Sequence, residues 1–364
     1  MQLLSIEVNN FKTFHKLTID NMLGLSVFIG ENGIGKSNIF SIIKILKSSL
    51  GGGIKPYLDN KNLDIKELFH NNIINSKLEI TLIFKCDSNQ YTYSLGIEYH
   101  NKNNFNIYKE LLLDSNKLII KNYLLDKKNS DCNTEVCIKT KSTQDEIMIC
   151  DCLDSIQIYN FEKKLKISSI VSDTNFQPVS LNESNIVNTL YILYCRYKAH
   201  FDVVNNVLFM MIPYFKEFIF QQKDNESKRL YIQMLNISKP VSLEKMSSGS
   251  IRLLQLATML SLPVCLRPSL LILQEPEIGL HPAVLEMVAD LIDAYSKENS
   301  IIVSTQSTIL LDKMNINNLY LLKLNNDIHK TDVVKIDIKK ISKSFKKYSL
   351  SDLWRMNILG NLIK

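Results

Sequence analysis

The stretch Gly30-Glu31-Asn32-Gly33-Ile34-Gly35-Lys36-Ser37 decides how the rest of the chain is interpreted. It has the spacing of a phosphate-binding loop: glycine, four residues, glycine, lysine, then serine or threonine. That motif requires a strand before it and a helix after it. The apolar run 25–29 predicts the buried strand, and apolar residues at helical spacing between 39 and 46 predict the helix. We therefore expect a nucleotide-binding loop rather than a glycine-rich turn without a ligand.

Each residue type in this loop suits a phosphate ligand. Gly33 and Gly35 allow the backbone a tight path, so that its N–H groups can approach phosphate oxygens closely. The helix that starts near Lys36 adds the positive end of its dipole, and the Lys36 ammonium can reach the β- and γ-phosphates. The Ser37 hydroxyl is placed to bind Mg²⁺.

Composition sets the class of protein. The 364 residues are 45% hydrophobic and 22% charged, which are ordinary globular values. No basic segment with an apolar stretch opens the chain, and no apolar run is long enough to cross a bilayer, so we expect a cytoplasmic protein without membrane contact. Seven cysteines without a secretory signal predict reduced thiols. The net charge of +6 permits contact with nucleic acid without requiring it.

The segment before the loop predicts two strands, at 3–8 and from 17, that lead into the loop strand. Between them lies Asn10-Phe11-Lys12-Thr13-Phe14. An aromatic ring and a cation at this place could contact a nucleotide, and we include Lys12 among the candidate nucleotide-binding residues. A strand end with a core phenylalanine and a surface lysine is an equally good interpretation. Further on, 78–85 and 91–99 alternate as two strands of a hairpin that turns at 87–89.

The middle of the chain has a weaker pattern. From about 108 to 177 we expect a peripheral insertion of short strands, with Cys132, Cys137, Cys150 and Cys152 across one hairpin. Four cysteines raise the question of zinc, but the spacing of two residues between ligands is missing, which favours simple packing. Between 183 and 222, apolar residues recur every three or four positions and predict a long amphipathic helix, or two, broken near Pro213. Its length suggests a lid or short arm over the nucleotide domain.

The second half supplies another candidate anion site. Met246-Ser247-Ser248-Gly249-Ser250-Ile251-Arg252 precedes an apolar helix over 253–262. Small hydroxyl residues and a glycine at a helix N-terminus can bind an anion. Since the loop at 30–37 already provides such a site, Ser247 and Gly249 suggest that the same triphosphate is gripped from another molecule. The alternative is an ordinary helix cap.

Two further strands end in polar side chains. The apolar strand 270–273 is followed by Gln274-Glu275-Pro276-Glu277. A carboxylate at the tip of a central strand that faces a phosphate loop can orient or deprotonate the attacking water, and Glu275 is our candidate. A helix over 283–295 and a strand over 300–303 then complete a βαβ unit. Gln306 follows that strand and should point to the same crevice.

With these residues assembled, the chain resembles the ABC-type ATPase heads of RecF-like, structural-maintenance-of-chromosomes (SMC) and OLD-like proteins. The motifs that carry the resemblance occur in that family's order: Asn-Phe-Lys-Thr-Phe, Gly-Glu-Asn-Gly-Ile-Gly-Lys-Ser-Asn, Met-Ser-Ser-Gly-Ser-Ile-Arg, Gln-Glu-Pro-Glu-Ile-Gly-Leu-His-Pro and Ser-Thr-Gln-Ser. The closing segments 348–354 and 359–360 resemble the tail of a compact bacterial group of AAA-family ATPases. The resemblance covers about residues 1–99 and 240–364.

The resemblance implies an α/β fold, an ABC-type P-loop NTPase head whose mixed sheet has central parallel strands. Residues 1–99 and 240–364 would be the two parts of the head, and 100–239 a β and helical insertion. The implied cofactors are ATP and Mg²⁺, held by Gly30, Asn32, Gly33, Gly35, Lys36, Ser37, Asn38 and Lys12, and in a second protomer by Ser247 and Gly249. Glu275 would be the catalytic base, Gln306 would sense the γ-phosphate, and Ser37 and Gln274 would hold the metal.

The implied function is an ATPase that pairs or assembles around ATP. Relatives serve in phage-defence modules, where the ATPase controls a nuclease or toxin encoded beside it, or act on DNA ends and in DNA repair. We expect a nucleotide-gated regulator of such an effector, and keep a DNA-repair ATPase as the alternative. DNA is left open as a partner.

Two residues depart from the family pattern. The family usually has an acid where Gln274 stands and a histidine where Gln306 stands. Neutral amides remove a negative charge near the metal and a proton carrier, so hydrolysis should be slow. The alternative is that glutamine is tolerated at both places and turnover is ordinary, because amides can also orient water and metal ligands.

Overall fold

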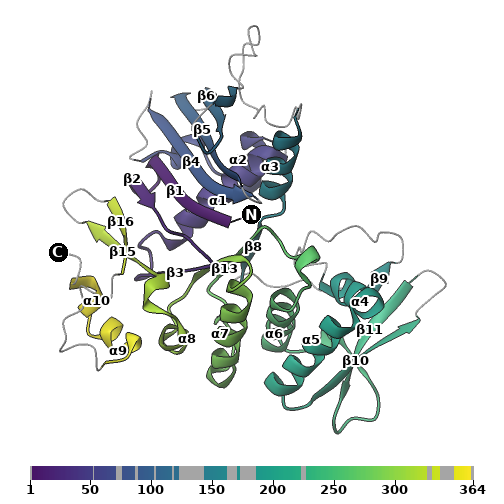
Figure 1. Ribbon diagram of the computed structural model, residues 1–364. Coiled ribbons are helices and arrows are strands. Elements are labelled where there is room, and N and C mark those ends of the chain that lie inside the picture. The colour runs from purple at the N-terminus through teal and green to yellow at the C-terminus, as the bar shows by residue number, and fades with distance from the viewer. Residues whose placement is uncertain are drawn as a thin grey trace.

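The computed structural model describes residues 2–51, 53–70, 76–86, 89–101, 104–116, 119–122, 143–161, 170–172, 186–222, 227–325, 330–336 and 348–361. In these ranges the chain forms three sheets with helices between and around them (Figure 1). No helix in the described ranges is both long and apolar enough to cross a bilayer.

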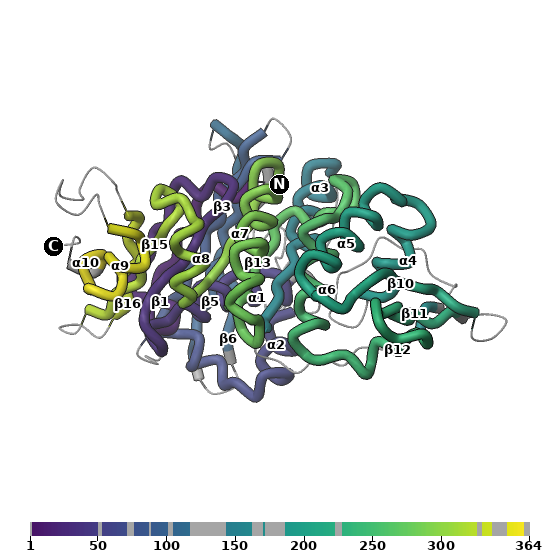
Figure 2. Tube along the Cα trace, turned by 90° about the horizontal axis from the view of Figure 1, so that it is seen from below, coloured from purple at the N-terminus to yellow at the C-terminus, as the bar shows by residue number. Residues whose placement is uncertain are grey.

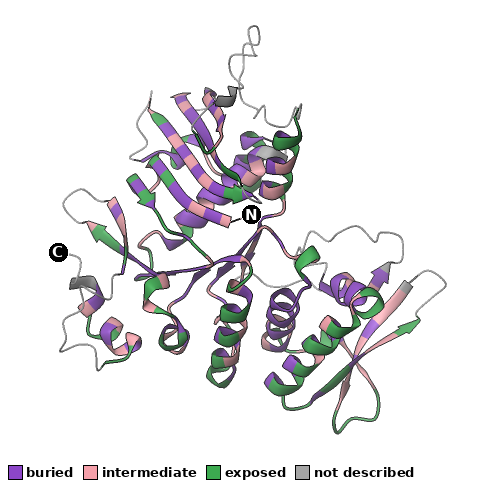
Figure 3. Cartoon of the chain, viewed as in Figure 1, coloured by how far each residue is buried: buried purple, intermediate pink, exposed green. Residues whose placement is uncertain are grey.

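The central sheet is the part that positions the site. Its order is β16 (Lys330–Lys335), β15 (Leu319–Asn325), β3 (Leu25–Ile29), β14 (Ser300–Ser304), β13 (Leu270–Gln274) and β8 (Gln157–Asn160). The five strands from β15 to β8 are parallel, and β16 pairs antiparallel with β15. Every residue of β3, β13 and β14 is buried (Figure 3), as expected for parallel strands covered on both faces. The predicted strands at 25–29, 270–273 and 300–303 are confirmed.

One face of this sheet is covered by helices and then by a second sheet. The helices are α1 (Lys36–Gly51), α2 (Ile54–Lys61) and α3 (Gln144–Asp154), with a 3₁₀ turn, η1 (Ile65–Leu68). The second sheet is antiparallel, in the order β2 (Phe14–Ile19), β1 (Gln2–Phe11), β4 (Lys77–Cys86), β5 (Asn89–Asn101), β6 (Asn104–Leu113) and β7 (Ile119–Asn122). The isoleucines of α1 belong to a core that includes both sheets, so α1 is buried between them. The predicted β4–β5 hairpin is confirmed.

The other face of the central sheet carries a second core. Figure 2 shows α8 (Thr308–Lys313), α7 (Pro282–Ser296) and α6 (Ser248–Leu260) side by side across the sheet. Beyond α6 lies a lobe of α4 (Ile186–Arg196), α5 (Lys198–Met211), β9 (Ile170–Ser172), β10 (Phe215–Gln222), β11 (Ser227–Met234) and β12 (Val241–Ser242). The remaining elements are η4 (Leu243–Lys245), η5 (Val264–Leu266), η6 (Ile316–Asn318), α9 (Leu350–Arg355) and α10 (Ile358–Asn361).

The expectation of a cysteine-bearing hairpin is wrong for the described part of that segment. Residues 144–154 form α3, because Thr143 and Glu146 make a reciprocal capping box at its N-terminus. Cys150 is buried in the core, and the Sγ atoms of Cys152 and Cys86 lie 3.2 Å apart. Cys132 and Cys137 lie outside the described residues. Within the described residues no three His, Cys, Asp or Glu side chains are grouped as a metal site would require.

The helical prediction for 183–222 is confirmed in its first part and wrong in its last. The chain forms α4 and α5, and Pro213 follows the end of α5. Residues 215–222 form β10 because β11 offers a strand partner over most of its length. The buried side chains of α4 and α5 join the core under α6. Within the segment expected as an insertion, β6 pairs with β5 and β8 joins the central sheet; the domain boundaries at 99 and 240 stay predictions.

Candidate functional site

The candidate site lies at the carboxyl edge of the central sheet. Because β3, β14, β13 and β8 are parallel neighbours, the residues that follow them emerge at the same edge. The structure therefore brings together the predicted loop after β3, Gln274 at the end of β13 with Glu275 after it, and Gln306 after β14. Asn160, at the end of β8, lies beside Gln274 in the strand register, and the sequence analysis did not select it.

The loop between β3 and α1 has the conformation that its glycines permit. Gly33 has φ 78° and Gly35 has φ 103°, in the region that favours glycine. Lys36 is 6% exposed, and its Nζ donates to the carbonyl oxygens of Gly30 at 2.6 Å and Glu31 at 2.9 Å. Burial lowers the pKa of Lys36, while the nearby carboxylates of Glu275, Glu277 and Glu31 oppose this shift. The ammonium is thus held inside the curve of the loop.

Two threonines brace the loop from outside, and the sequence analysis missed this role. The Thr331 hydroxyl on β16 donates to the Ile34 carbonyl at 2.7 Å, and its backbone N–H donates to the Thr13 carbonyl at 2.9 Å. The Thr13 hydroxyl accepts a hydrogen bond from Asn38 Nδ2 at 3.1 Å. A Cβ added to Gly35 would lie 2.7 Å from Thr13 Oγ1 and 3.2 Å from Thr331 Oγ1. These contacts leave the loop little room to change its path.

Glu275 and Gln306 meet as the sequence predicted. Gln306 Nε2 donates to Glu275 Oε1 at 2.8 Å and to Asn32 Oδ1 at 2.5 Å. Glu275 has φ 50°, a left-handed conformation that costs a non-glycine residue about 1 kcal/mol or more, and its N–H donates to the Ser304 carbonyl at 3.0 Å. The carboxylate, the amide and the loop therefore form one hydrogen-bonded chain across the crevice.

Glu277 fixes the segment that carries Gln306, and it was also missed. Its Oε1 accepts hydrogen bonds from Thr305 Oγ1 at 2.8 Å, from the Gln306 N–H at 2.7 Å and from the Ser307 N–H at 3.2 Å. Burial raises the pKa of Glu277, although these hydrogen bonds act in the opposite direction. Its other oxygen, Oε2, is buried and has no hydrogen-bond partner among the described residues.

Gln274 stands where the family usually has an acid, and it is 6% exposed. Its Oε1 accepts a hydrogen bond from Lys44 Nζ on α1 at 3.3 Å, and its Nε2 is buried without a partner in the described part of the chain. A lysine on the amide oxygen competes with a cation for the same lone pairs. The Ser37 side chain is exposed and makes no hydrogen bond to the described residues, so Ser37, with phosphate oxygens, is the better fit for Mg²⁺.

The Ser247 turn is a separate, outward-facing part of the site. The Ser247 side chain caps α6 by accepting from the Ser250 N–H at 3.1 Å, and Ser247 and Ser248 are exposed. Gly249 packs against the next loop, since an added Cβ would lie 2.8 Å from the Gly279 carbonyl oxygen. No hydrogen bond among the described residues joins this turn to the loop at 30–38.

Lys12 lies beside α1 rather than on a free strand end. It has φ 47°, its Nζ is 3.5 Å from Ser41 Oγ, and burial lowers its pKa. Phe11 and Phe14 are fully buried, so the aromatic part of this segment is core packing. Lys12 therefore stays a candidate cation for the nucleotide, whereas the two phenylalanines do not.

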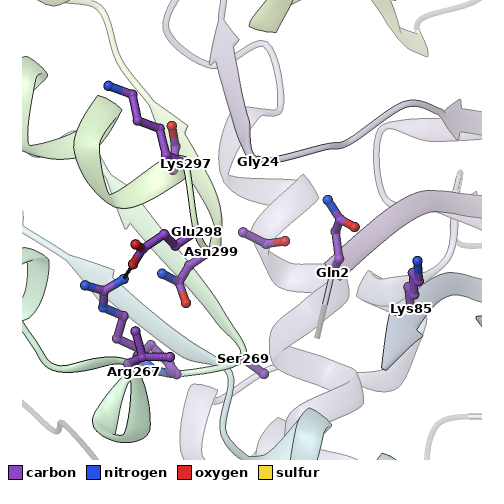
Figure 4. Close-up of a pocket in the computed structure, with 12 residues that line it drawn as sticks. Gln2, Gly24, Lys85, Arg267, Ser269, Lys297, Glu298 and Asn299 are labelled. Carbon is purple, nitrogen blue, oxygen red and sulfur yellow. Dashed lines mark hydrogen bonds and ion pairs between the residues drawn. The ribbon is translucent and has the colours of Figure 1, made fainter. Parts of the chain in front are cut away.

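A second hollow, of about 440 Å³, lies at the opposite edge of the sheet, near Gly24 and Ser300 (Figure 4). Two of its three described cationic side chains, Arg267 and Lys297, are engaged in ion pairs, and the third is Lys85. Arg267 pairs with Glu298 at 2.7 Å, and Lys297 pairs with Asp293 at 3.1 Å. We assign it no function.

The comparisons with known proteins agree with this geometry. A stretch of 72 residues is 36% identical to the chromosome partition protein Smc of Methanocaldococcus jannaschii, and 53 residues are 40% identical to the DNA replication and repair protein RecF of Heliobacterium modesticaldum. These matches cover 17% and 15% of this chain but only 6% and 13% of the relatives.

The solved structures extend the likeness over most of the chain. A crystal structure of the SmcHead bound to the C-winged helix domain of ScpA has a TM-score of 0.61 and 16% identity, and the match covers 93% of this chain and 99% of that one. A family model described as "AAA domain, putative AbiEii toxin, Type IV TA system" matches residues 25–136 and 203–312, more than half of the chain. The chain belongs to that family, and its fold is the ABC-type ATPase head of RecF- and SMC-like proteins.

Proposed function

We propose that this protein binds ATP with Mg²⁺ and assembles around it, and that this assembly regulates an effector. The observation that carries the proposal is that one chain has two separate, incomplete anion sites. The loop at 30–38 is braced and holds Lys36, and the Ser247 turn is exposed and makes no hydrogen bond to that loop among the described residues. A second copy would supply the missing half of each site, so that two ATP molecules join two protomers.

In the assembled state Glu275 acts as the base that takes a proton from the attacking water. The activated water then attacks the γ-phosphate, and ATP is hydrolysed to ADP and phosphate. Gln306, held by Glu277 through its backbone, orients the water and touches the γ-phosphate. Ser37 would hold Mg²⁺, and Gln274 would contribute its amide oxygen only when Lys44 releases it. This competition supports slow hydrolysis, with the ATP-bound assembly as the working state.

A complementation experiment tests the shared site. Lys36→Ala breaks the loop half and Gly249→Asp breaks the turn half, so neither protein alone should assemble with ATP and Mg²⁺. An equimolar mixture can form one intact composite site per heterodimer and should recover ATP-dependent dimers in light scattering. Glu275→Gln, which keeps both halves, should assemble as well as the wild type and serves as the control. A mixture no better than its components would reject the two-protomer site.

The effector is proposed from the family, whose description names a toxin and a type IV toxin–antitoxin system. We infer a role in antiviral defence with a neighbouring-gene product, such as a nuclease or toxin, as partner. The alternative is a DNA-repair ATPase, which the short matches to Smc and RecF favour. Purification with its neighbour's product would support the first role, and duplex binding with a steep salt dependence the second.

A further inference from the structure

A hollow of about 630 Å³ lies between α1, α2 and β8, away from the nucleotide loop. Its lining includes three lysines, Lys44 and Lys47 of α1 and Lys61 at the end of α2. The other described lining residues are Ser48, Gly53, Pro56, Tyr57, Asn60, Gln157 and Ile158, and none of the described lining residues carries a carboxylate. A volume of this size suits a ligand of nucleotide dimensions.

Two of the three lysines at this hollow, Lys47 and Lys61, make no close ion pair with the described residues. Neither Lys47 nor Lys61 lies within 4 Å of a carboxylate oxygen in the described ranges. Lys47 instead donates to the backbone carbonyls of Asp154, at 2.9 Å, and Ile156; burial lowers its pKa, and the more distant Asp154 carboxylate opposes this shift. Two half-buried lysines on α1, with the exposed Lys61 of α2 lining the same hollow, favour an anion that approaches all three ammonium groups together.

We propose that this hollow binds a phosphorylated small molecule with at least two negative charges, at a site distinct from the ATP loop. The distinction rests on helix geometry. Lys44 and Lys47 follow Lys36 by 8 and 11 residues, about 12 and 16 Å along α1, so the triphosphate in the loop does not reach Lys47. The apolar lining, from Pro56, Tyr57 and Ile158, gives room for a part of the ligand that is not phosphate.

The site has a physical connection to catalysis through Lys44. The same ammonium lines the hollow and donates to Gln274 Oε1 at 3.3 Å. An anion in the hollow draws Lys44 away from Gln274 and frees the amide oxygen for the metal. Occupancy would therefore promote hydrolysis; this coupling, unlike the binding itself, rests on the proposed function.

The test uses inorganic pyrophosphate as the probe and the full-length Lys36→Ala protein, whose nucleotide loop is disabled. Calorimetry should show one pyrophosphate site per chain. Adding Lys61→Gln, at an exposed position, should weaken pyrophosphate binding by about tenfold or more, as expected for a lost charged contact. Adding Lys47→Gln instead should weaken it to the same extent. The matched control is Lys55→Gln, an exposed lysine of α2 outside the lining, which should leave the affinity unchanged.

Three outcomes would overturn the site: no pyrophosphate binding, equal loss in the Lys55→Gln control, or binding that Lys61→Gln leaves unchanged. A duplex oligonucleotide that binds where pyrophosphate does not would make this surface a nucleic-acid contact instead. Because the background lacks a working loop, failure here leaves the ATP-driven assembly untouched, and failure of that assembly leaves this result valid.

Discussion

The brace on the nucleotide loop gives the sharpest prediction, because its central contact comes from a strand near the end of the chain. Thr331 is 1% exposed and its hydroxyl donates to the Ile34 carbonyl at 2.7 Å. Thr331→Val keeps the shape of the side chain and removes the hydroxyl group that donates this hydrogen bond. A buried carbonyl left without its partner costs about 1–3 kcal/mol. If that cost falls on the loop conformation that binds ATP, affinity should drop by about 5- to 150-fold.

The assay is calorimetric or fluorescent titration of ATP with Mg²⁺ into wild type, Thr331→Val and the matched control Thr331→Ser, which keeps the hydroxyl. Urea unfolding of the three proteins separates the local effect from general destabilisation. We expect Thr331→Ser to bind ATP nearly as tightly as the wild type. Equal affinity in Thr331→Val, or an equal loss in both variants, would refute the claim that this hydroxyl positions the loop.

Three other predictions follow from the same edge of the sheet. Lys36→Ala should abolish any increase in molecular mass that ATP and Mg²⁺ cause in light scattering, because the loop loses its ammonium; persistent assembly would mean that nucleotide is not what joins the protomers. Gln274→Asp combined with Gln306→His should raise steady-state phosphate release by about tenfold or more if the amides slow hydrolysis, and an unchanged rate would favour ordinary turnover. Burial raises the pKa of Glu277 in the folded state above its ordinary 4.5. The free energy of unfolding should therefore fall as the pH rises from 4.5 through the raised pKa. Glu277→Gln cannot ionise, so its stability relative to the wild type in urea unfolding should improve as the pH is raised from 4.5; a constant difference would contradict the raised pKa.

The sequence was informative where chemistry depends on local order along the chain. The loop at 30–37 needs a strand, two glycines and a helix in succession, and all of these are local. Glu275 and Gln306 were found because each follows an apolar strand, and parallel strands place such residues at one edge. The same reasoning would have placed Asn160 there, had the short strand 157–160 been recognised within a weak pattern.

The residues that were missed act over long separations. Thr331 contacts Ile34 across 297 residues, and no local pattern marks a threonine in an edge hairpin as a brace. Lys44 was an unremarkable helix lysine until the structure placed it on Gln274, 230 residues away. The helix over 144–154 was a different kind of error, since its capping box, Thr143 and Glu146, is visible in the sequence and was not used.

The two parts of the proposed ATP site, the loop at 30–38 and the Ser247 turn, are carried by elements that pack in different hydrophobic cores, and β13 contributes side chains to both cores. Leu270 and Ile272 pack with α1 and the antiparallel sheet, whereas Leu271 and Leu273 pack with α6 and the α4–α5 lobe. This alternation is the ordinary two-residue period of a strand. β3 and β14 alternate between the two cores in the same way, so a shift of the Ser247 turn against the braced loop would be taken up across all three strands that end at the candidate site. Glu275, our proposed base, follows one of these strands in a left-handed conformation, so its position is expected to respond when a second protomer binds the Ser247 turn.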